Sequence, residues 1–254
     1  MDALDARLDL AQRIAREAGT RLLAFSRERL DVSAKGAQDF VTAADRAVET
    51  MIREAVAAAF PGDTVLGEEE GGEVADRLWV VDPIDGTINF IRGLPSYAVS
   101  IAYVEGECLE LGVVHIPLLG ETFTARRGHG AFCNERPLRV SACARLADAR
   151  IAAGYAQRGS RAQHLRFLGR LMRAGSDILK VNSAAVCLAM TAAGRIDGYF
   201  ERELMAWDVL GGQLLVREAG GFTNDFGAHG LTRKDYTIAC GPALAAELRA
   251  AAQV

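Results

Sequence analysis

One segment constrains this 254-residue chain more than any other: a short apolar strand that leads directly into two acids. The strand is predicted over 77–82, ends at Asp82, and is separated from Asp85 by Pro83 and Ile84. A short apolar run of this kind is typical of a buried strand, so both acids fall where it ends in the core. Because Pro83 bends the backbone, the two carboxylates can converge on one point. Held that close, they repel one another unless a proton or a cation lies between them.

The residues after Asp85 predict an anion site beside the two acids. Gly86 allows close approach of the backbone, and Thr87 opens a predicted short helix whose first N–H groups point outward. Such a helix start attracts anions. A site that holds a cation next to an anion is what phosphoryl transfer needs. The plainer interpretation is a turn at Asp85-Gly86 with Asp82 as a helix cap, and for an isolated Asp-Gly pair that interpretation is favoured.

Further acids favour the functional interpretation. The segment Gly67-Glu68-Glu69-Glu70-Gly71-Gly72 places carboxylates in a loop just upstream of the strand, although alone it would more often be a solvated charge run. Asp208 follows Trp207 at the start of an apolar helix, where it could be a ligand or simply the helix cap.

The hydrophobic pattern changes near residue 144. Before it, amphipathic helices are predicted over 3–28 and 43–60, and β-rich runs over 97–104, 108–116 and 122–125 suggest an antiparallel meander. Gly128-His-Gly130 is interpreted as a turn. After it, strands over 149–153, 177–181, 196–200 and 236–239 alternate with helices over 161–173, 183–193 and 207–219, and Pro242 opens a last helix. We therefore expect an α/β protein in which an α+β half, 1–144, joins an α/β half, 145–254, in one compact unit.

Composition excludes several classes of protein. Acids outnumber Lys and Arg by 33 to 29, giving a formal net charge of −4, and half of the residues are hydrophobic, which excludes intrinsic disorder. Without a basic block, general nucleic-acid binding is not expected. The five cysteines are odd in number and scattered, which predicts buried thiols in a reducing compartment. The N-terminus is charged, so no signal peptide is predicted. The longest apolar stretch, 109–119, is too short to span a membrane, and we therefore expect a cytoplasmic protein.

Taken together, these motifs resemble the inositol monophosphatase family of Mg²⁺-dependent phosphatases. The main matches are Gly67-Glu68-Glu69, Asp82-Pro-Ile-Asp85-Gly-Thr87-x-Asn89-Phe90 and Trp207-Asp208. The supporting matches are Asp39-Phe-Val-Thr42-Ala-Ala-Asp45, Gly128-x-Gly130-Ala-Phe-Cys-Asn134 and Glu218-Ala-Gly-Gly221. They occur in the family's order from about Lys35 to Gly221, which is most of the chain. The resemblance implies a layered α/β/α/β/α sandwich, a homodimer and inhibition by Li⁺.

The resemblance also implies roles for individual residues. Two or three Mg²⁺ ions, with Mn²⁺ as a possible substitute, would be held by Glu68, Asp82, the backbone carbonyl of Ile84, Asp85 and Asp208. An all-oxygen set of ligands without His or Cys suits these ions. The water that attacks phosphorus would be oriented and deprotonated with the help of Thr87, Asp45 and Glu68. The phosphate would be held by the amides of Gly86 and Thr87 and faced by Lys35, and the alcohol would be contacted by Asp85, Ser183, Ala184 and Glu201.

The expected activity is hydrolysis of a phosphate monoester, with myo-inositol 1-phosphate or a related polyol phosphate as the leading substrate. Glu201 favours a polyol, since a carboxylate accepts hydrogen bonds from hydroxyls but repels extra phosphates. The chain departs from the family at Ile88, which is not a ligand position, and at Leu179-Lys-Val-Asn182-Ser183, where Asn182 adds bulk beside the alcohol. Histidinol phosphate, a sugar bisphosphate and a 3′,5′-bisphosphonucleotide therefore remain alternatives. A regulatory RNA- or protein-binding role is the other class, and the acidic balance argues against direct RNA binding.

Overall fold

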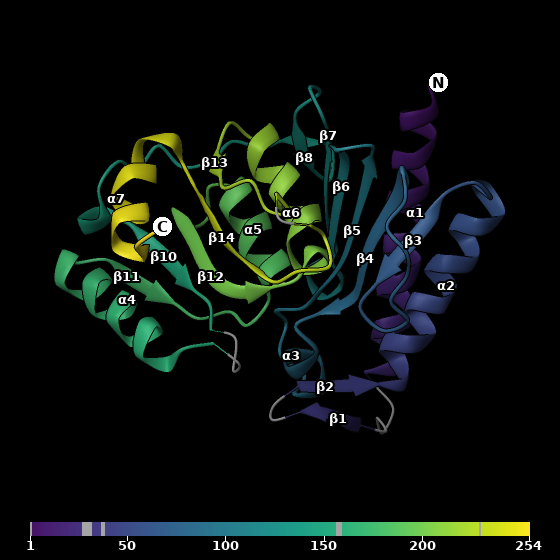
Figure 1. Ribbon diagram of the computed structural model, residues 1–254, viewed down its shortest axis with the longest axis horizontal. Helices are drawn as coiled ribbons and strands as arrows, with labels where there is room; N and C mark the ends of the chain where they lie inside the picture. The colour runs from purple at the N-terminus through teal and green to yellow at the C-terminus, as the bar shows by residue number, and fades with distance from the viewer. Residues whose placement is uncertain (1, 27–31, 37–38, 156–158, 229) are drawn as a thin grey trace.

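The computed structural model describes residues 2–26, 32–36, 39–155, 159–228 and 230–254, with the strands in 32–42 described by their backbone. Helices and sheets alternate in layers (Figure 1). Helices α1 (Ala3–Phe25) and α2 (Ala43–Ala59) form an outer layer, α5 (Ala184–Ala192) and α6 (Ala206–Glu218) lie between two sheets, and α4 (Arg161–Ala174) and α7 (Ala245–Ala252) form the opposite outer layer. This is the layered α/β/α/β/α sandwich that the family resemblance implies.

The larger sheet has seven strands in the order β3-β4-β5-β6-β7-β8-β9. Its strands are β3 (Thr64–Gly67), β4 (Arg77–Asp85), β5 (Ala98–Glu105), β6 (Cys108–Ile116), β7 (Glu121–Arg126), β8 (Ala131–Cys133) and β9 (Arg136–Pro137). From β4 to β9 every neighbouring pair is antiparallel, and β3 pairs parallel to β4. The predicted antiparallel meander is confirmed.

Strand β4 is apolar from Leu78 to Val81 because both faces of this sheet are covered there. Successive side chains of a strand point to opposite faces. Leu78 and Val80 accordingly join the core formed with α5 and α6, whereas Trp79 and Val81 join the core formed with α1 and α2. An antiparallel sheet with one solvated face would alternate apolar and polar residues instead.

The smaller sheet has five strands in the order β11-β10-β12-β14-β13. Its strands are β10 (Arg150–Ala153), β11 (Asp177–Leu179), β12 (Gly198–Leu204), β13 (Phe222–Thr223) and β14 (Asp235–Cys240). Strand β10 is parallel to both β11 and β12, and β14 is antiparallel to its two neighbours. The alternation of strands and helices predicted for this half is confirmed.

Shorter elements complete the fold. They are the antiparallel hairpin of β1 (Val32–Gly36) and β2 (Asp39–Thr42), helix α3 (Thr87–Ile91), and the 3₁₀ helices η1 (Pro117–Leu119), η2 (Leu146–Asp148) and η3 (Pro242–Leu244). Pro242 opens η3, which leads directly into α7. Gly128-His-Gly130 forms the predicted turn between β7 and β8, and all five cysteines are free thiols. No helix in the described parts of the chain is long and apolar enough to cross a membrane.

The structure corrects the ends of two predicted strands. The strand predicted to end at Asp82 continues to Asp85, and the strand predicted over 196–200 lies at Gly198–Leu204. Glu201 therefore lies within β12 and not in a loop after it. The helix predicted over 3–28 ends at Phe25, and positions 27–28 lie outside the described residues. The division at residue 144 stays a prediction, and the apolar core around α5 and α6 contains residues from both sides of it.

Candidate metal and phosphate site

A bulge at the end of β4 brings Asp82 and Asp85 to the same side of the chain. Asp82 pairs with Ser100 and Asp85 with Ala98, so β4 has one more residue than β5 between these pairs. In a regular strand, residues three apart point to opposite faces, and one extra residue cancels that offset. Pro83 fits the irregular stretch because it has no N–H to donate to a ladder. The amide of Ile84 donates to Oδ1 of Asp82 (2.9 Å).

Asp208 completes the group from the first turn of α6. Asp208 is not the cap residue of α6, which is Met205, but its Oδ2 accepts a hydrogen bond from the amide of Met205 (2.7 Å). Ser100 of β5 donates from its hydroxyl to the carbonyl of Trp207 (3.1 Å), which fixes the start of α6 against the sheet. Among the described residues, Asp82, Asp85 and Asp208 each offer a carboxylate oxygen within 4.8 Å of the other two.

Burial raises the pKa of all three acids, and repulsion by neighbouring acids adds to the rise for Asp82 and Asp208. For Asp82, burial is the largest cause of the raised pKa, followed by the charges of Glu68, Asp85 and Asp208. Burial and the charges of Glu68 and Asp85 likewise raise the pKa of Asp208. Burial raises the pKa of Asp85 to about 6, against hydrogen bonds that lower it. Among the residues that the structure describes, no positive charge contributes to the pKa of these three carboxylates, and a cation that prefers oxygen ligands, such as Mg²⁺, fits them.

Glu68 lies next to this group, in the loop that follows β3. Its amide donates to the carbonyl of Val81 (3.2 Å), directly before Asp82. Its charge contributes to the raised pKa of both Asp82 and Asp208, so its carboxylate faces the same space. It is not one of the three acids within 4.8 Å of one another. The structure thus brings Glu68 to the edge of the acidic group and not into its centre.

Thr87 and Asp45 meet on the other side of the bulge. The hydroxyl of Thr87 lies 3.3 Å from Oδ1 of Asp45 and 3.0 Å from the carbonyl oxygen of Ile84, within hydrogen-bonding distance of both. Asp45 is buried in the first turn of α2. Residues from two separate elements, α2 and the start of α3, therefore form the pair that the resemblance implies.

Gly86 needs to be glycine at the start of α3. Its φ of 95° lies in the left-handed region, and an added Cβ would lie 3.0 Å from the carbonyl oxygen of Ser96 and 3.2 Å from that of Asn182. The short α3 begins at the next residue, Thr87, as predicted. Asn89 belongs to the motif that begins at Asp82, and the sequence alone assigns no role to its side chain. Its side-chain amide donates to the carbonyls of Ser96 (2.5 Å) and Val181 (2.8 Å), which ties α3 to the segment that leads into α5.

The residues expected at the alcohol gather around Asp85. Ser183 caps α5 and donates from its hydroxyl to Oδ2 of Asp85 (2.6 Å), and the amide of Ala185 donates to the same oxygen (2.6 Å). Ala184, between them, is buried. The Asp85 charge also helps to raise the pKa of Glu201, so these two acids face one another.

Glu201 is not the surface charge that its sequence neighbours suggest. Burial raises its pKa to about 7, and the Tyr199 hydroxyl, which donates to Oε2 (2.6 Å), opposes that rise. Tyr199 is fully buried, and sequence reasoning assigned it no role. Its position two residues before Glu201 in one strand is the signal that could have revealed it, since residues i and i+2 share a face. The side chain of Lys35 lies outside the described residues.

Comparison with known proteins agrees with this geometry. The chain matches the model of the inositol monophosphatase family over residues 3–254. It is 43% identical over 220 residues to the inositol-1-monophosphatase of Rhizobium meliloti, covering 84% of this chain and 82% of that protein. It is 39% identical over 250 residues to the Nus factor SuhB of Pasteurella multocida, covering 95% and 93%. The crystal structure of the extragenic suppressor protein suhB of Bartonella henselae superposes with a TM-score of 0.92 at 38% identity, covering 98% of each chain.

Proposed function

Because the chain belongs to the inositol monophosphatase family, we propose that it hydrolyses the phosphate monoester of a polyol, with myo-inositol 1-phosphate as the leading substrate and Mg²⁺ as the cofactor. One observation carries this proposal: the carboxylates of Asp82 and Asp85, which are buried, and of Asp208, which is half-buried, converge within 4.8 Å. Such a group needs positive charge to exist in its ionised form. The family supports a phosphatase of the hydrolase class, and the polyol substrate is the finer step proposed here.

The proposed ligands of the metal are Glu68, Asp82, the carbonyl of Ile84, Asp85 and Asp208, which would hold two or three ions. When bound, Mg²⁺ would supply positive charge that polarises the phosphate, lowers the pKa of a bound water and stabilises the negative charge on the leaving alcohol oxygen. Mn²⁺ prefers the same oxygen ligands and is expected to substitute. Ca²⁺ prefers longer bonds and looser geometry, and is expected to inhibit.

The chain's own groups would orient the attacking water and take its proton. Asp45 is the proposed proton acceptor, because its carboxylate is buried and touches the hydroxyl of Thr87. The Thr87 hydroxyl has one proton and two acceptors in reach, so it would give direction to the water's hydrogen bonds. Glu68, at the edge of the acidic group, would assist from the metal side. The amides of Gly86 and Thr87 would hold phosphate oxygens at the bulge.

The alcohol is proposed to lie between Asp85 and Glu201, beside Ser183 and Ala184. A half-buried carboxylate such as Glu201 accepts hydrogen bonds from hydroxyls, which favours a polyol. The same charge disfavours a second phosphate, which argues against a sugar bisphosphate or a 3′,5′-bisphosphonucleotide. Histidinol phosphate, whose amine would be attracted to a carboxylate, is the strongest alternative substrate.

The test of this proposal is a panel of phosphate esters ranked by kcat/KM at saturating Mg²⁺. The panel contains myo-inositol 1-phosphate, histidinol phosphate, fructose 1,6-bisphosphate, a 3′,5′-bisphosphonucleotide and an aryl phosphate. We expect the inositol ester to rank first by at least about tenfold, the factor that corresponds to 1.4 kcal/mol in the barrier. A higher rank for either bisphosphate would overturn the polyol assignment and leave the phosphatase assignment standing.

The relatives named Nus factor SuhB favour one second candidate function, a regulatory role through binding to RNA or protein. The Asp82→Asn variant separates the two functions because it removes a proposed metal ligand and leaves the surface unchanged. If the regulatory role exists, this variant keeps its binding to RNA or protein partners while hydrolysis is lost.

We also propose a homodimer from the family resemblance, which light scattering on the purified protein would test.

A further inference from the structure

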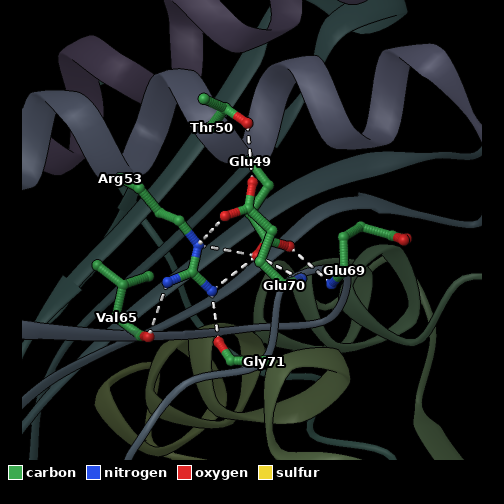
Figure 2. A network of polar contacts seen from close by, with 7 residues as sticks. All are labelled: Glu49, Thr50, Arg53, Val65, Glu69, Glu70 and Gly71. Atoms are coloured by element: carbon green, nitrogen blue, oxygen red, sulfur yellow. Dashed lines mark hydrogen bonds and ion pairs between the residues drawn. The ribbon is translucent and has the colours of Figure 1, made fainter.

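The loop that carries Glu68 is held by a carboxylate from another element, Glu49 of α2. Glu49 has no exposed surface. Its Oε2 accepts a hydrogen bond from the amide of Glu69 (2.8 Å), and its Oε1 accepts one from the amide of Glu70 (3.0 Å). Figure 2 shows both bonds running from the helix to the loop. Glu49 therefore binds the backbone on the C-terminal side of Glu68.

Arg53, one helical turn after Glu49, binds the backbone on both sides of the same loop. It donates to Oε1 of Glu49 from Nε (3.0 Å) and Nη2 (2.8 Å). Its Nη1 donates to the carbonyl of Val65 (3.1 Å), before the loop, and its Nη2 also donates to the carbonyl of Gly71, after it. Figure 2 shows the guanidinium between these partners. The ion pair thus has hydrogen bonds to the loop on both sides, which is the condition for a buried pair to be stable.

Gly67, the residue before Glu68, leaves the space that Glu49 occupies. A Cβ on Gly67 would lie 2.2 Å from Oε1 of Glu49 and 2.7 Å from Oε2. Any other residue would displace the carboxylate from the two loop amides. Close approach by a buried acid is therefore the physical reason for the glycine in Gly67-Glu68-Glu69.

Glu68 lies between two fixed points. On one side its own amide donates to the carbonyl of Val81 in β4, next to Asp82. On the other side the amides of Glu69 and Glu70 are bound by Glu49. The side chain of Glu69 points away from Glu49 in Figure 2, so Glu49 contacts this residue through the backbone. The backbone of Glu68 has little freedom to turn its carboxylate away from Asp82 and Asp208.

We propose that Glu49 is a positioning residue that holds Glu68 toward the acidic group and thereby sets the affinity of the site for its cation. The proposal rests on the proposed function in one respect, that Glu68 is a metal ligand. Groups that orient metal ligands from outside typically change metal affinity by about 10- to 100-fold when they are replaced. Glu49→Gln keeps the shape of the side chain but turns an N–H₂ group toward a loop amide or toward Arg53.

The test measures Mn²⁺ binding through the electron paramagnetic resonance signal of the free ion, which needs no turnover. We expect Glu49→Gln to weaken Mn²⁺ binding by about tenfold or more. At saturating Mg²⁺ we expect kcat to stay within about threefold of wild type, because the ligands themselves remain. A loss of kcat with unchanged Mn²⁺ affinity would overturn the proposal.

A double-mutant cycle with Glu68→Gln shows whether Glu49 acts through Glu68. Contacting residues in one network give non-additive effects, so Glu49→Gln should weaken Mn²⁺ binding no further in the Glu68→Gln background. Fully additive losses would mean that Glu49 acts by another route, which contradicts the proposal. If Glu68→Gln itself leaves Mn²⁺ binding unchanged, Glu68 is not a ligand, and the proposed metal site fails instead.

Asp63→Asn is the matched control. The Asp63 side chain is 1% exposed and accepts two hydrogen bonds from an arginine, Arg7, as Glu49 does from Arg53, and a third from the Trp79 indole. We expect this variant to lower the melting temperature without changing Mn²⁺ affinity. If Glu49→Gln does not fold, Gly67→Ala makes the same test with the charge kept, since its Cβ displaces Glu49. Wild-type Mn²⁺ affinity in folded Gly67→Ala would also overturn the proposal.

Discussion

The Ser183 hydroxyl donates a 2.6 Å hydrogen bond to Oδ2 of Asp85, a residue 98 positions earlier in the chain. The bond joins the first turn of α5 to the end of β4 and so connects the middle helical layer to the larger sheet. Together with the amides of Ala184 and Ala185, it opposes the burial that raises the pKa of Asp85 to about 6. The geometry of the acidic group therefore depends on residues that are not ligands.

Ser183→Ala is expected to shift the acid limit of cation binding. The hydroxyl favours the charged form of Asp85, so its removal raises the pKa of this acid above about 6. Cation binding needs the carboxylate, so the midpoint of Mn²⁺ affinity against pH should move upward. A lost hydrogen bond to a charged group, about 1.5–3 kcal/mol, corresponds to about one to two pH units. Titrations between pH 5 and 8 measure the midpoint, and a midpoint equal to that of wild type would contradict the assignment.

Asp82→Asn is expected to stabilise the protein when no metal is bound. Burial and neighbouring acids raise the pKa of Asp82 well above its usual value. For an acid with a raised folded-state pKa, stability is full below its unfolded pKa and is lost as pH rises through the folded pKa. The neutral amide removes that loss at pH 7.5. A gain of about 1 kcal/mol would raise the melting temperature by about 2–4 °C.

Melting curves in chelator and in Mg²⁺ test this expectation. Mg²⁺ should raise the melting temperature of the wild type and leave that of Asp82→Asn unchanged, because a ligand stabilises only what it binds. A lower melting temperature of the variant in chelator would show that Asp82 has a structural role and is not under repulsion.

Glu201→Gln is expected to change substrate preference more than catalysis. A hydrogen bond between a hydroxyl and a charged group contributes about 1.5–3 kcal/mol. The corresponding loss in kcat/KM on myo-inositol 1-phosphate is about tenfold to a hundredfold. An aryl phosphate has no hydroxyls for Glu201 to contact and should be hydrolysed at the wild-type rate. Equal losses on both substrates would place Glu201 in the catalytic or structural core.

The protein is expected to lose stability at acidic pH because of His115. Burial, with the charge of Arg16, lowers its pKa to about 4, and its ring lies 3.0 Å from the Thr122 hydroxyl. A histidine with a lowered folded-state pKa is protonated first in the unfolded chain, so stability falls as pH drops from about 6.5 to about 4. Between pH 7 and pH 5 this group alone would cost about 2 kcal/mol.

Urea denaturation of the wild type and of His115→Gln at pH 7 and pH 5 measures this loss. The acids of the site titrate in the opposite sense, so the comparison at each pH is between the two proteins in the same buffer. The free energy of unfolding of the wild type should fall further than that of the variant. Equal falls would mean that His115 has the same pKa in the folded protein as in the unfolded chain, which contradicts the prediction.

The sequence predicts the identity of the site residues better than their arrangement. The acids at 82, 85 and 208 stand out in the sequence because each interrupts or opens an apolar element. The bend at Pro83 predicts that Asp82 and Asp85 converge, and the structure agrees. The form of the bend, a bulge inside β4, is not predicted, because a strand's period alone places the two residues on opposite faces. The charges after Phe200 predict that the strand ends there, whereas Glu201 pairs with Thr237 of β14 and so belongs to the strand.

The role of Glu49 could not be predicted from the sequence pattern. It lies next to Val48 on the buried side of an amphipathic helix, where an acid is unusual. Besides Arg53, its partners are two backbone amides about twenty residues later. Amides carry no side-chain signature, so only the position of the loop in space shows why the acid is there.

The most direct measurement of the central claim is phosphate release from myo-inositol 1-phosphate by the purified protein. The protein is first treated with a chelator and then titrated with Mg²⁺, alongside the Asp208→Asn variant. If the buried acids form the metal site of a phosphatase, release is absent after chelation, returns with Mg²⁺ in the wild type, and stays below about one hundredth of that rate in the variant. Release that persists after chelation, or that Asp208→Asn leaves intact, would contradict the claim.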